Sequence, residues 1–133
     1  MESYFILYVN DQALSRSFYA AALAVQPRLD VPGMTEFDLP GGGVLGLMPI
    51  EGIKKLLGPN LPDPSRAQGF PRAELYLLVD HPDLHHSQAV RAGGKELSPL
   101  LARSWGHSAA YCLDPDSHVL AFASATAGTE RVA

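Results

Sequence analysis

The side chains best suited to chemistry lie in two segments of the second half of the chain. In the first segment, Glu74 stands directly before the apolar run 75–79. Alternation along an extended strand puts Glu74 on the same face as Tyr76 and Leu78. A carboxylate in an apolar groove needs a partner, so Glu74 is a candidate for holding a cationic or hydroxyl group of a ligand. The alternative is a solvated carboxylate at a strand end beside Arg72.

The second segment combines an indole, an imidazole and a phenol. Trp105 is the only tryptophan and lies in a Ser-Trp-Gly-His context that predicts a loop. It is a candidate to stack on a ligand or to cover the edge of the core. His107 and Tyr111 are candidate catalytic groups for acid–base chemistry, which requires a partner that orients the imidazole. Whether such a partner exists is left open by the sequence.

The first half offers a matching but weaker set. An apolar run at 4–9 would place Tyr4 and Tyr8 on one strand face, either as packed core residues with hydroxyls at the rim or as ligand-lining phenols. Farther along, Glu36 alternates with Phe37 in a third apolar segment. Glu36 therefore either adds negative charge to a groove or faces water.

Periodicity predicts the elements that position these groups. The runs 4–9 and 75–79 are short, apolar at every position and typical of strands covered on both faces. A helix follows each run, the second beginning near Pro82 and ending at Gly93-Gly94. The first helix would begin at a cap formed by Asn10 or Asp11 and bury the stripe Leu14, Phe18, Ala21, Ala22 and Val25.

Three further strands are predicted after each helix. They occupy 28–31, 34–39 and 44–48 in the first half, and 95–98, 107–113 and 119–124 in the second. The repeated order indicates an internal duplication. We expect a first module at 1–57 with a short trailing helix at 53–57, a Pro/Gly-rich linker at 58–72 that connects or covers, and a second module with a C-terminal tail at 73–133. The two modules would form one structural unit.

Composition excludes several classes of protein. Of the 133 residues, 47% are hydrophobic and 18% charged, which is not the composition of a disordered chain. The net charge of −4, without a basic run, argues against nucleic-acid partners and against docking on an anionic membrane. The single cysteine, Cys112, excludes an internal disulfide and predicts an inert core thiol. The start of the chain shows no secretory signal, so we expect a cytoplasmic protein.

Two segments carry a resemblance to a known family. They are residues 9–27 and 105–122, whose matching marks are Asp11, Ser15, Phe18, Tyr19, the Trp-Gly pair and the Asp-Pro-Asp turn at 114–116. In this order the chain resembles the vicinal oxygen chelate superfamily, which includes glyoxalase, bleomycin-resistance, fosfomycin-resistance and extradiol-dioxygenase proteins. The resemblance covers residues 4–124. It implies an α+β fold of two βαβββ modules whose curved mixed sheets form a ligand groove, with helices on the outer face, frequently across a homodimer.

The resemblance also implies where a metal would bind. Metal-using relatives have ligands at four groove positions, which correspond here to Tyr4, Gly46, Glu74 and Ala121. A hard divalent cation needs several oxygen or imidazole ligands. Glycine and alanine offer none and a protonated tyrosine is a poor ligand, so only Glu74 could coordinate. We therefore expect the inherited metal site to be lost and no cofactor to be required.

Three functions follow as hypotheses. The first is a metal-independent, homodimeric small-molecule-binding protein of the bleomycin-resistance type that sequesters an aromatic or cationic ligand through Tyr4, Tyr8, Glu36, Glu74, Tyr76, Trp105 and Tyr111. The second is a glyoxalase-type lyase or isomerase whose divalent metal is held by the non-standard ligands Glu74, His107 and Glu36. The third is a dimeric scaffold or regulatory partner whose groove is filled by its own side chains.

Overall fold

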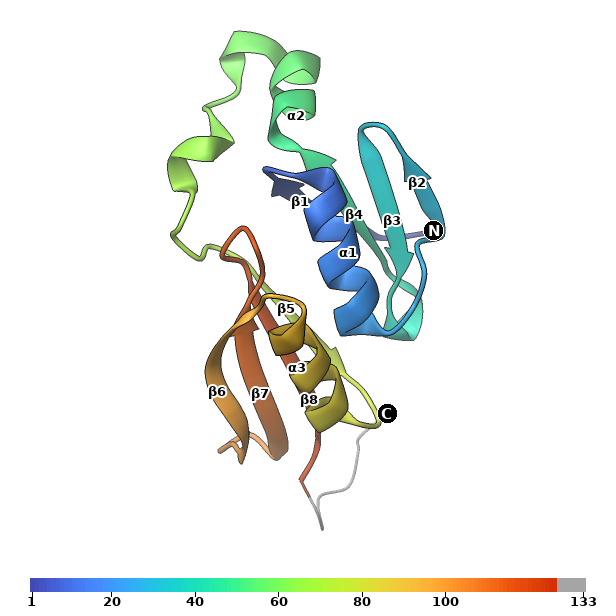
Figure 1. The fold of residues 1–133 in the computed structure, drawn as a ribbon, viewed down its shortest axis with the longest axis vertical. Coiled ribbons are helices and arrows are strands. Elements are labelled where there is room, and N and C mark those ends of the chain that lie inside the picture. Colours follow the sequence, from blue (N-terminus) through green and yellow to red (C-terminus); the bar gives the residue numbers. More distant parts are fainter. Residues whose placement is uncertain (127–133) are drawn as a thin grey trace.

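Each half of the sequence forms one four-stranded mixed sheet, as Figure 1 shows. The structure is a computed structural model that describes residues 1–126. The first half contains β1 (Tyr4–Val9), α1 (Gln12–Leu23), β2 (Leu29–Val31), β3 (Met34–Asp38) and β4 (Val44–Pro49), in the sheet order β1-β4-β3-β2. The second contains β5 (Glu74–Leu78), α3 (Pro82–Arg91), β6 (Lys95–Ala102), β7 (His107–Leu113) and β8 (Val119–Ala125), in the order β5-β8-β7-β6. The predicted α+β fold of two βαβββ modules is confirmed.

In each sheet the first strand runs parallel to the last, and the remaining pairs are antiparallel. The parallel pairs β1–β4 and β5–β8 bring the start of each module beside its end. The sequence predicted that the strand starting at residue 95 ends at residue 98. In the structure this strand, β6, continues past Pro99 to Ala102. It does so through irregular pairing with β7 between Ser98 and Leu101. A proline, which cannot donate a ladder hydrogen bond, is tolerated at such an irregularity.

The segment between the sheets is helical rather than extended. It contains α2 (Ile50–Leu57) and two short 3₁₀ helices, η2 (Gly58–Asn60) and η3 (Pro64–Ala67). The linker adds no strand to either sheet, as the prolines and glycines predicted. In Figure 1 it runs along one side of the molecule from the end of α2 down to β5.

Helix α1 begins where the sequence predicted but presents a different face. The Asp11 carboxylate caps the helix by accepting the backbone N–H of Leu14 at 3.0 Å. The predicted stripe is wrong at Leu14, Ala21 and Val25, which are exposed, and right at Phe18 and Ala22. Ser15 and Tyr19 are buried instead. Both hydroxyls bond to carboxylates of the second module, and this rotates the helix away from its most apolar side.

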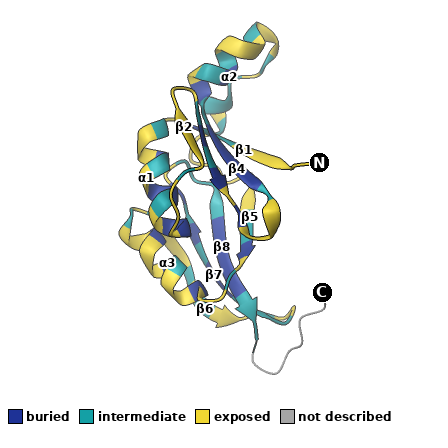
Figure 2. Cartoon of the chain, turned by 90° about the vertical axis from the view of Figure 1, so that its right-hand side faces the viewer, coloured by how far each residue is buried: buried dark blue, intermediate teal, exposed yellow. Residues whose placement is uncertain are grey.

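One hydrophobic core joins the two modules. Helices α1 and α3 pack against each other, and the core includes residues from both sheets: Val9, Phe18, Phe37, Leu45, Leu47, Leu77, Cys112, Leu120 and Phe122. Figure 2 shows the central strands β4 and β8 largely buried and the edge strands β2 and β6 largely exposed. Each sheet therefore has one face against the helices. The opposite face is called the open face below.

Cys112 lies on the helix-facing side of β7 and is fully buried. Burial, with the charges of Asp114 and Glu96, raises the pKa of this thiol to about 11. The thiol is therefore protonated at neutral pH and unreactive, as the sequence predicted. Within residues 1–126, no helix is long and apolar enough to cross a membrane. The end of the expected C-terminal tail, residues 127–133, lies outside the described residues.

Candidate functional site

The open face of the second sheet carries most of the side chains that the sequence singled out. Strand register places Ala121 of β8 between Tyr76 of β5 and Tyr111 of β7. Glu74 and His107 lie on the same face by alternation. Ala121 is fully buried although it faces away from the helices. The phenols of Tyr76 and Tyr111 therefore lie on either side of Ala121, whose side chain is only a methyl group.

Trp105, Tyr76 and His107 form one hydrogen-bonded trio on this face. The indole Nε1 of Trp105 donates to the Tyr76 hydroxyl at 3.0 Å, and that hydroxyl shares a hydrogen bond of 2.7 Å with Nδ1 of His107. The rings of Tyr76 and His107 are stacked, with centroids 5.8 Å apart. His107 therefore has the orienting partner that the sequence left open. Trp105 is 54% exposed, so it does not cover the core.

Arg103 is a member of this site that the sequence interpretation missed. Its guanidinium donates to the Ser98 hydroxyl at 2.6 Å and to the Ala109 carbonyl at 2.8 Å. The same group lies 5.1 Å from the ring centroid of Tyr111, within cation–π range. Burial, with the negative charge of Glu74 and the nearby Tyr76, raises the pKa of Tyr111. The Tyr111 phenol is therefore a neutral hydrogen-bond donor at physiological pH.

The first-sheet candidates lie apart from this group. Tyr4 and Tyr8 lie on the open face of β1, and Glu36 lies on the same face of β3. Figure 1 shows the first sheet above the second along the long axis. The Glu36 carboxylate is 3.6 Å from Arg28. The same guanidinium also contacts the carboxylates of Asp38 at 3.1 Å and Glu2 at 3.7 Å, so one positive charge is shared among three negative charges. Within residues 1–126, no hydrogen bond or ion pair joins these three residues to the second-sheet trio.

The four positions inherited from metal-using relatives do not fit a metal ion. A Cβ on Gly46 would stand 3.1 Å from Cγ1 of Ile6 and 3.2 Å from Sδ of Met34, so any side chain there would require these two neighbours to shift by a few tenths of an ångström. Ala121 offers only a methyl group. Of the two positions that carry oxygen, Tyr4 offers a phenol, which is a poor ligand when protonated, so only the Glu74 carboxylate could coordinate an ion. The described part of the chain also contains no cluster of three or more His, Cys, Asp or Glu side chains.

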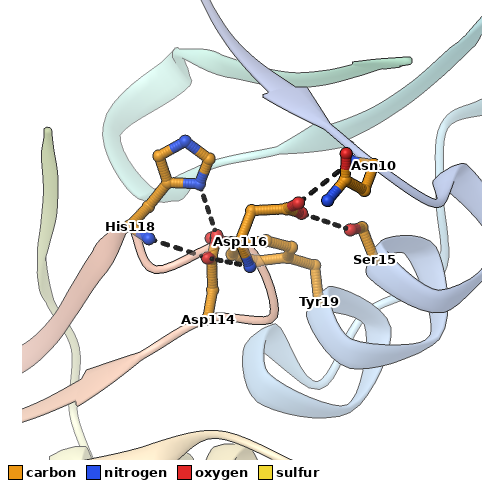
Figure 3. Close-up of polar contacts among 6 residues, drawn as sticks. All are labelled: Asn10, Ser15, Tyr19, Asp114, Asp116 and His118. Carbon is orange, nitrogen blue, oxygen red and sulfur yellow. Dashed lines mark hydrogen bonds and ion pairs between the residues drawn. The ribbon is translucent and has the colours of Figure 1, made fainter. Parts of the chain in front are cut away.

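The Asp-Pro-Asp turn binds the two modules together, as Figure 3 shows. Buried Asp114 accepts the Tyr19 hydroxyl at 2.6 Å and Nδ1 of His118 at 2.9 Å. Its other oxygen accepts the backbone N–H groups of Asp116 and His118, both at 2.9 Å. A single carboxylate thus fixes its own turn and holds α1 of the first module.

Asp116 adds a second connection to the same helix. It accepts the backbone N–H of Asn10 at 2.9 Å and the hydroxyl of Ser15 at 3.3 Å (Figure 3). Burial raises the pKa of this carboxyl, only partly offset by the Asn10 hydrogen bond. The marks on which the resemblance rests, Ser15, Tyr19 and the Asp-Pro-Asp turn, therefore bind one another. Their role in this chain is structural.

The Asp-Pro-Asp turn also shifts the pKa values of two side chains that contact it, Tyr19 and His118. Burial, then the charge and hydrogen bond of Asp114, raises the pKa of the Tyr19 hydroxyl well above its ordinary value. For His118, burial opposes protonation. The hydrogen bond and charge of Asp114, with the charge of Asp116, outweigh that effect and raise the pKa of His118.

Paired βαβββ modules, with an aromatic and acidic cluster on an open sheet face, define a class of small-molecule-binding folds. The sequence comparison specifies the family. The model of the Glyoxalase/Bleomycin resistance protein/Dioxygenase superfamily matches residues 3–122, and the chain belongs to this superfamily. No curated protein sequence matches the chain significantly.

Solved structures share the fold. A glyoxalase-related enzyme from Fulvimarina pelagi superposes with a TM-score of 0.78 at 22% identity, over 93% of this chain and 87% of that one. A glyoxalase/bleomycin resistance protein/dioxygenase family enzyme from Burkholderia phytofirmans gives 0.78 at 18% identity, over 93% and 98%. Protein ATC0852 from Agrobacterium tumefaciens gives 0.72 at 26% identity, over 95% and 98%.

Proposed function

We propose that this protein binds and sequesters a planar aromatic small molecule without a metal, with a cationic group of the ligand against Glu74. The observation that carries the proposal is the Trp105–Tyr76–His107 trio on the open face. The lack of donor side chains at Gly46 and Ala121 supports metal independence. The buried free thiol of Cys112 suits a reducing compartment, and we place the protein in the cytoplasm.

The trio supplies a stacking surface that is ordered before the ligand arrives. An exposed indole would normally lose side-chain freedom on binding, at a cost of about 0.5–1.5 kcal/mol. Here the hydrogen bond to Tyr76 holds Trp105 in place although half of its surface is exposed. Aromatic burial against this surface, at about 25 cal/mol per Å² of apolar area, provides most of the affinity.

The charges near the trio favour a cationic ring system. Glu74 makes no ion pair within the described chain, whereas the guanidinium of Arg103 is occupied by Ser98, Ala109 and the Tyr111 ring. The carboxylate is therefore the charged group free to meet a ligand. His107 keeps Nε2 for a further hydrogen bond, because Nδ1 is taken by Tyr76.

A binding experiment tests the charge preference. We expect N-methylacridinium, a planar aromatic cation, to bind more tightly than neutral acridine, as measured by isothermal titration calorimetry at pH 8. Glu74→Gln should weaken N-methylacridinium about fivefold, or ~1 kcal/mol, and leave acridine unchanged. The control is Glu51→Gln on α2, which removes another exposed carboxylate away from the trio. Failure of both acridines to bind the unmodified protein would refute sequestration of planar aromatics.

We also propose that two copies of the chain associate through their open faces. Tyr4 and Ile6 lie side by side on the open face of the first sheet, and each is 43% exposed. Exposed apolar clusters of this kind mark interaction surfaces. The association would place the first-sheet phenols of one copy over the trio of the other, and so unite the two groups of candidate residues.

Sedimentation equilibrium tests this association. We expect the protein to be a dimer at about 50 μM, and Tyr4→Lys to shift it to monomer because a lysine ammonium would be buried without a partner. Leu84→Lys is the control, since Leu84 is an apolar residue on α3 that is more exposed than Tyr4, at 56%. A monomeric unmodified protein at that concentration contradicts the proposal.

A glyoxalase-type lyase is the second candidate, favoured by the oriented imidazole of His107. The metal ligands that the sequence suggested for it were Glu74, His107 and Glu36. The structure does not gather them within one chain, because Glu36 is paired with Arg28 on the other sheet. Elemental analysis of protein purified without chelator separates the two functions. Stoichiometric zinc, nickel, manganese or iron would favour the lyase.

A further inference from the structure

A separate cavity lies beneath the linker, between β1, the start of α2 and the Asp-Pro-Asp turn. It measures about 420 Å³, within the range of about 300–1,000 Å³ that is usual for small-molecule sites. Glu74, Tyr76, Trp105, His107 and Tyr111 do not line it. Within one chain the cavity is therefore distinct from the open-face site of the second sheet, although it shares Ile6 and Tyr8 with the open face of the first sheet.

Most of the cavity lining is apolar, and it is supplied by β1, the start of α2 and the linker. Ile50 at the start of α2 forms one wall, and Leu61 and Phe70 of the linker form another. Ile6 and Tyr8 of β1 contribute the base. A ligand here would leave water mainly through contact with aliphatic and aromatic carbon.

An imidazole and a guanidinium border the same cavity. The His118 ring is held by Asp114 through Nδ1, and in Figure 3 its other ring nitrogen points away from that carboxylate. Arg72 also lines the cavity and makes no ion pair or side-chain hydrogen bond within residues 1–126. The one carboxylate at the cavity, Asp116, is already bonded to Asn10 and Ser15.

We propose that this cavity binds a small monocarboxylate with an apolar body, such as a medium-chain fatty acid or an arylalkanoic acid. Arg72 and Nε2–H of His118 donate to the carboxylate, and Ile50, Leu61 and Phe70 enclose the apolar body. The raised pKa of His118 favours the imidazolium form, which keeps Nε2 a donor near neutral pH. The linker is then a wall of a binding site as well as a connection between modules.

Titration with octanoate, 4-phenylbutyrate and 1-octanol tests this site at pH 6.5. We expect one or both carboxylates to bind at least tenfold more tightly than the uncharged alcohol. Arg72→Gln should weaken carboxylate binding about tenfold, because an arginine–carboxylate contact is charge-assisted. The matched control is Arg66→Gln, which removes a linker arginine that does not line the cavity and should leave the affinity unchanged.

Methyl NMR spectra locate the bound carboxylate. Shifts at Ile50 and Leu61 are expected, and shifts confined to Ala109 and Ala121 would place the ligand on the open face and overturn the proposal. Equal binding of octanoate and octanol, no loss in Arg72→Gln, or no binding at millimolar concentration would each overturn it as well. These outcomes do not depend on whether acridines bind at the trio.

Discussion

Asp114→Asn is expected to lower the free energy of unfolding by about 3 kcal/mol. The buried Asp114 carboxylate accepts four hydrogen bonds, two of them from the side chains of Tyr19 and His118. An asparagine of the same shape would keep one accepting oxygen and present an amide donor in place of the other. Depending on which way the amide lies, either the buried Tyr19 hydroxyl and His118 or the two backbone N–H groups of the turn would then lose their acceptor.

The same substitution should change how stability depends on pH. The folded-state pKa of His118 is raised, so the stability it contributes is complete below the ordinary histidine value and is lost as the pH rises through the folded value. The unmodified protein is therefore expected to lose stability between about pH 6 and pH 8. Asp114→Asn removes the partner that raises this pKa and should flatten that dependence.

Urea unfolding at pH 6 and pH 8 measures both effects in one series. Asp80→Asn is the control, because Asp80 is exposed at the end of β5 and makes no side-chain hydrogen bond in the described chain. It should shift the free energy of unfolding by less than about 0.5 kcal/mol. An Asp114→Asn variant that matched this control would show that the turn does not hold the modules together.

Apolar patterning was sufficient to predict the strands and their order. The runs at 4–9 and 107–113 coincide with β1 and β7, since a short apolar run between turn residues has few other stable arrangements. Alternation also placed Glu74 and Tyr76 on one face. These features depend on local spacing, which the sequence displays directly.

Long-range polar partners were the features that patterning could not predict. The Tyr19 hydroxyl reaches Asp114, 95 positions away, and this contact decides which face of α1 is buried. Arg103 joins the aromatic cluster through Ser98 and a backbone carbonyl, and no spacing in the sequence marks those contacts. The sequence also did not show that the Glu36 carboxylate lies beside the guanidinium of Arg28. In each of these contacts the two partners come together only when the chain is folded, so the sequence alone does not show which residues pair.

Gly46→Glu is expected to lower the free energy of unfolding by about 3 kcal/mol and to confer no metal binding. The variant restores an oxygen donor at an inherited metal position. A side chain there meets Ile6 Cγ1 at 3.1 Å and Met34 Sδ at 3.2 Å, already at its first carbon. The Ile6 side chain is β-branched and stiff, so most of the adjustment falls on Met34. Gly52→Glu is the matched control, because its Cβ meets only Met48 Cε, at 3.9 Å.

A double-mutant cycle separates packing from charge at this position. Gly46→Ala adds one methyl group and should cost about 1–2 kcal/mol by overpacking. Met34→Ala removes one of the two close neighbours, so the pair should cost less than the sum of the single variants, as measured by urea unfolding. Additive costs would mean that Met34 does not close the position. Stoichiometric zinc bound by a stable Gly46→Glu variant would mean that one added carboxylate restores metal binding although Ala121 still offers no donor. Sub-additive costs without metal binding would instead show that Ile6 and Met34 have taken over the space where relatives hold an ion.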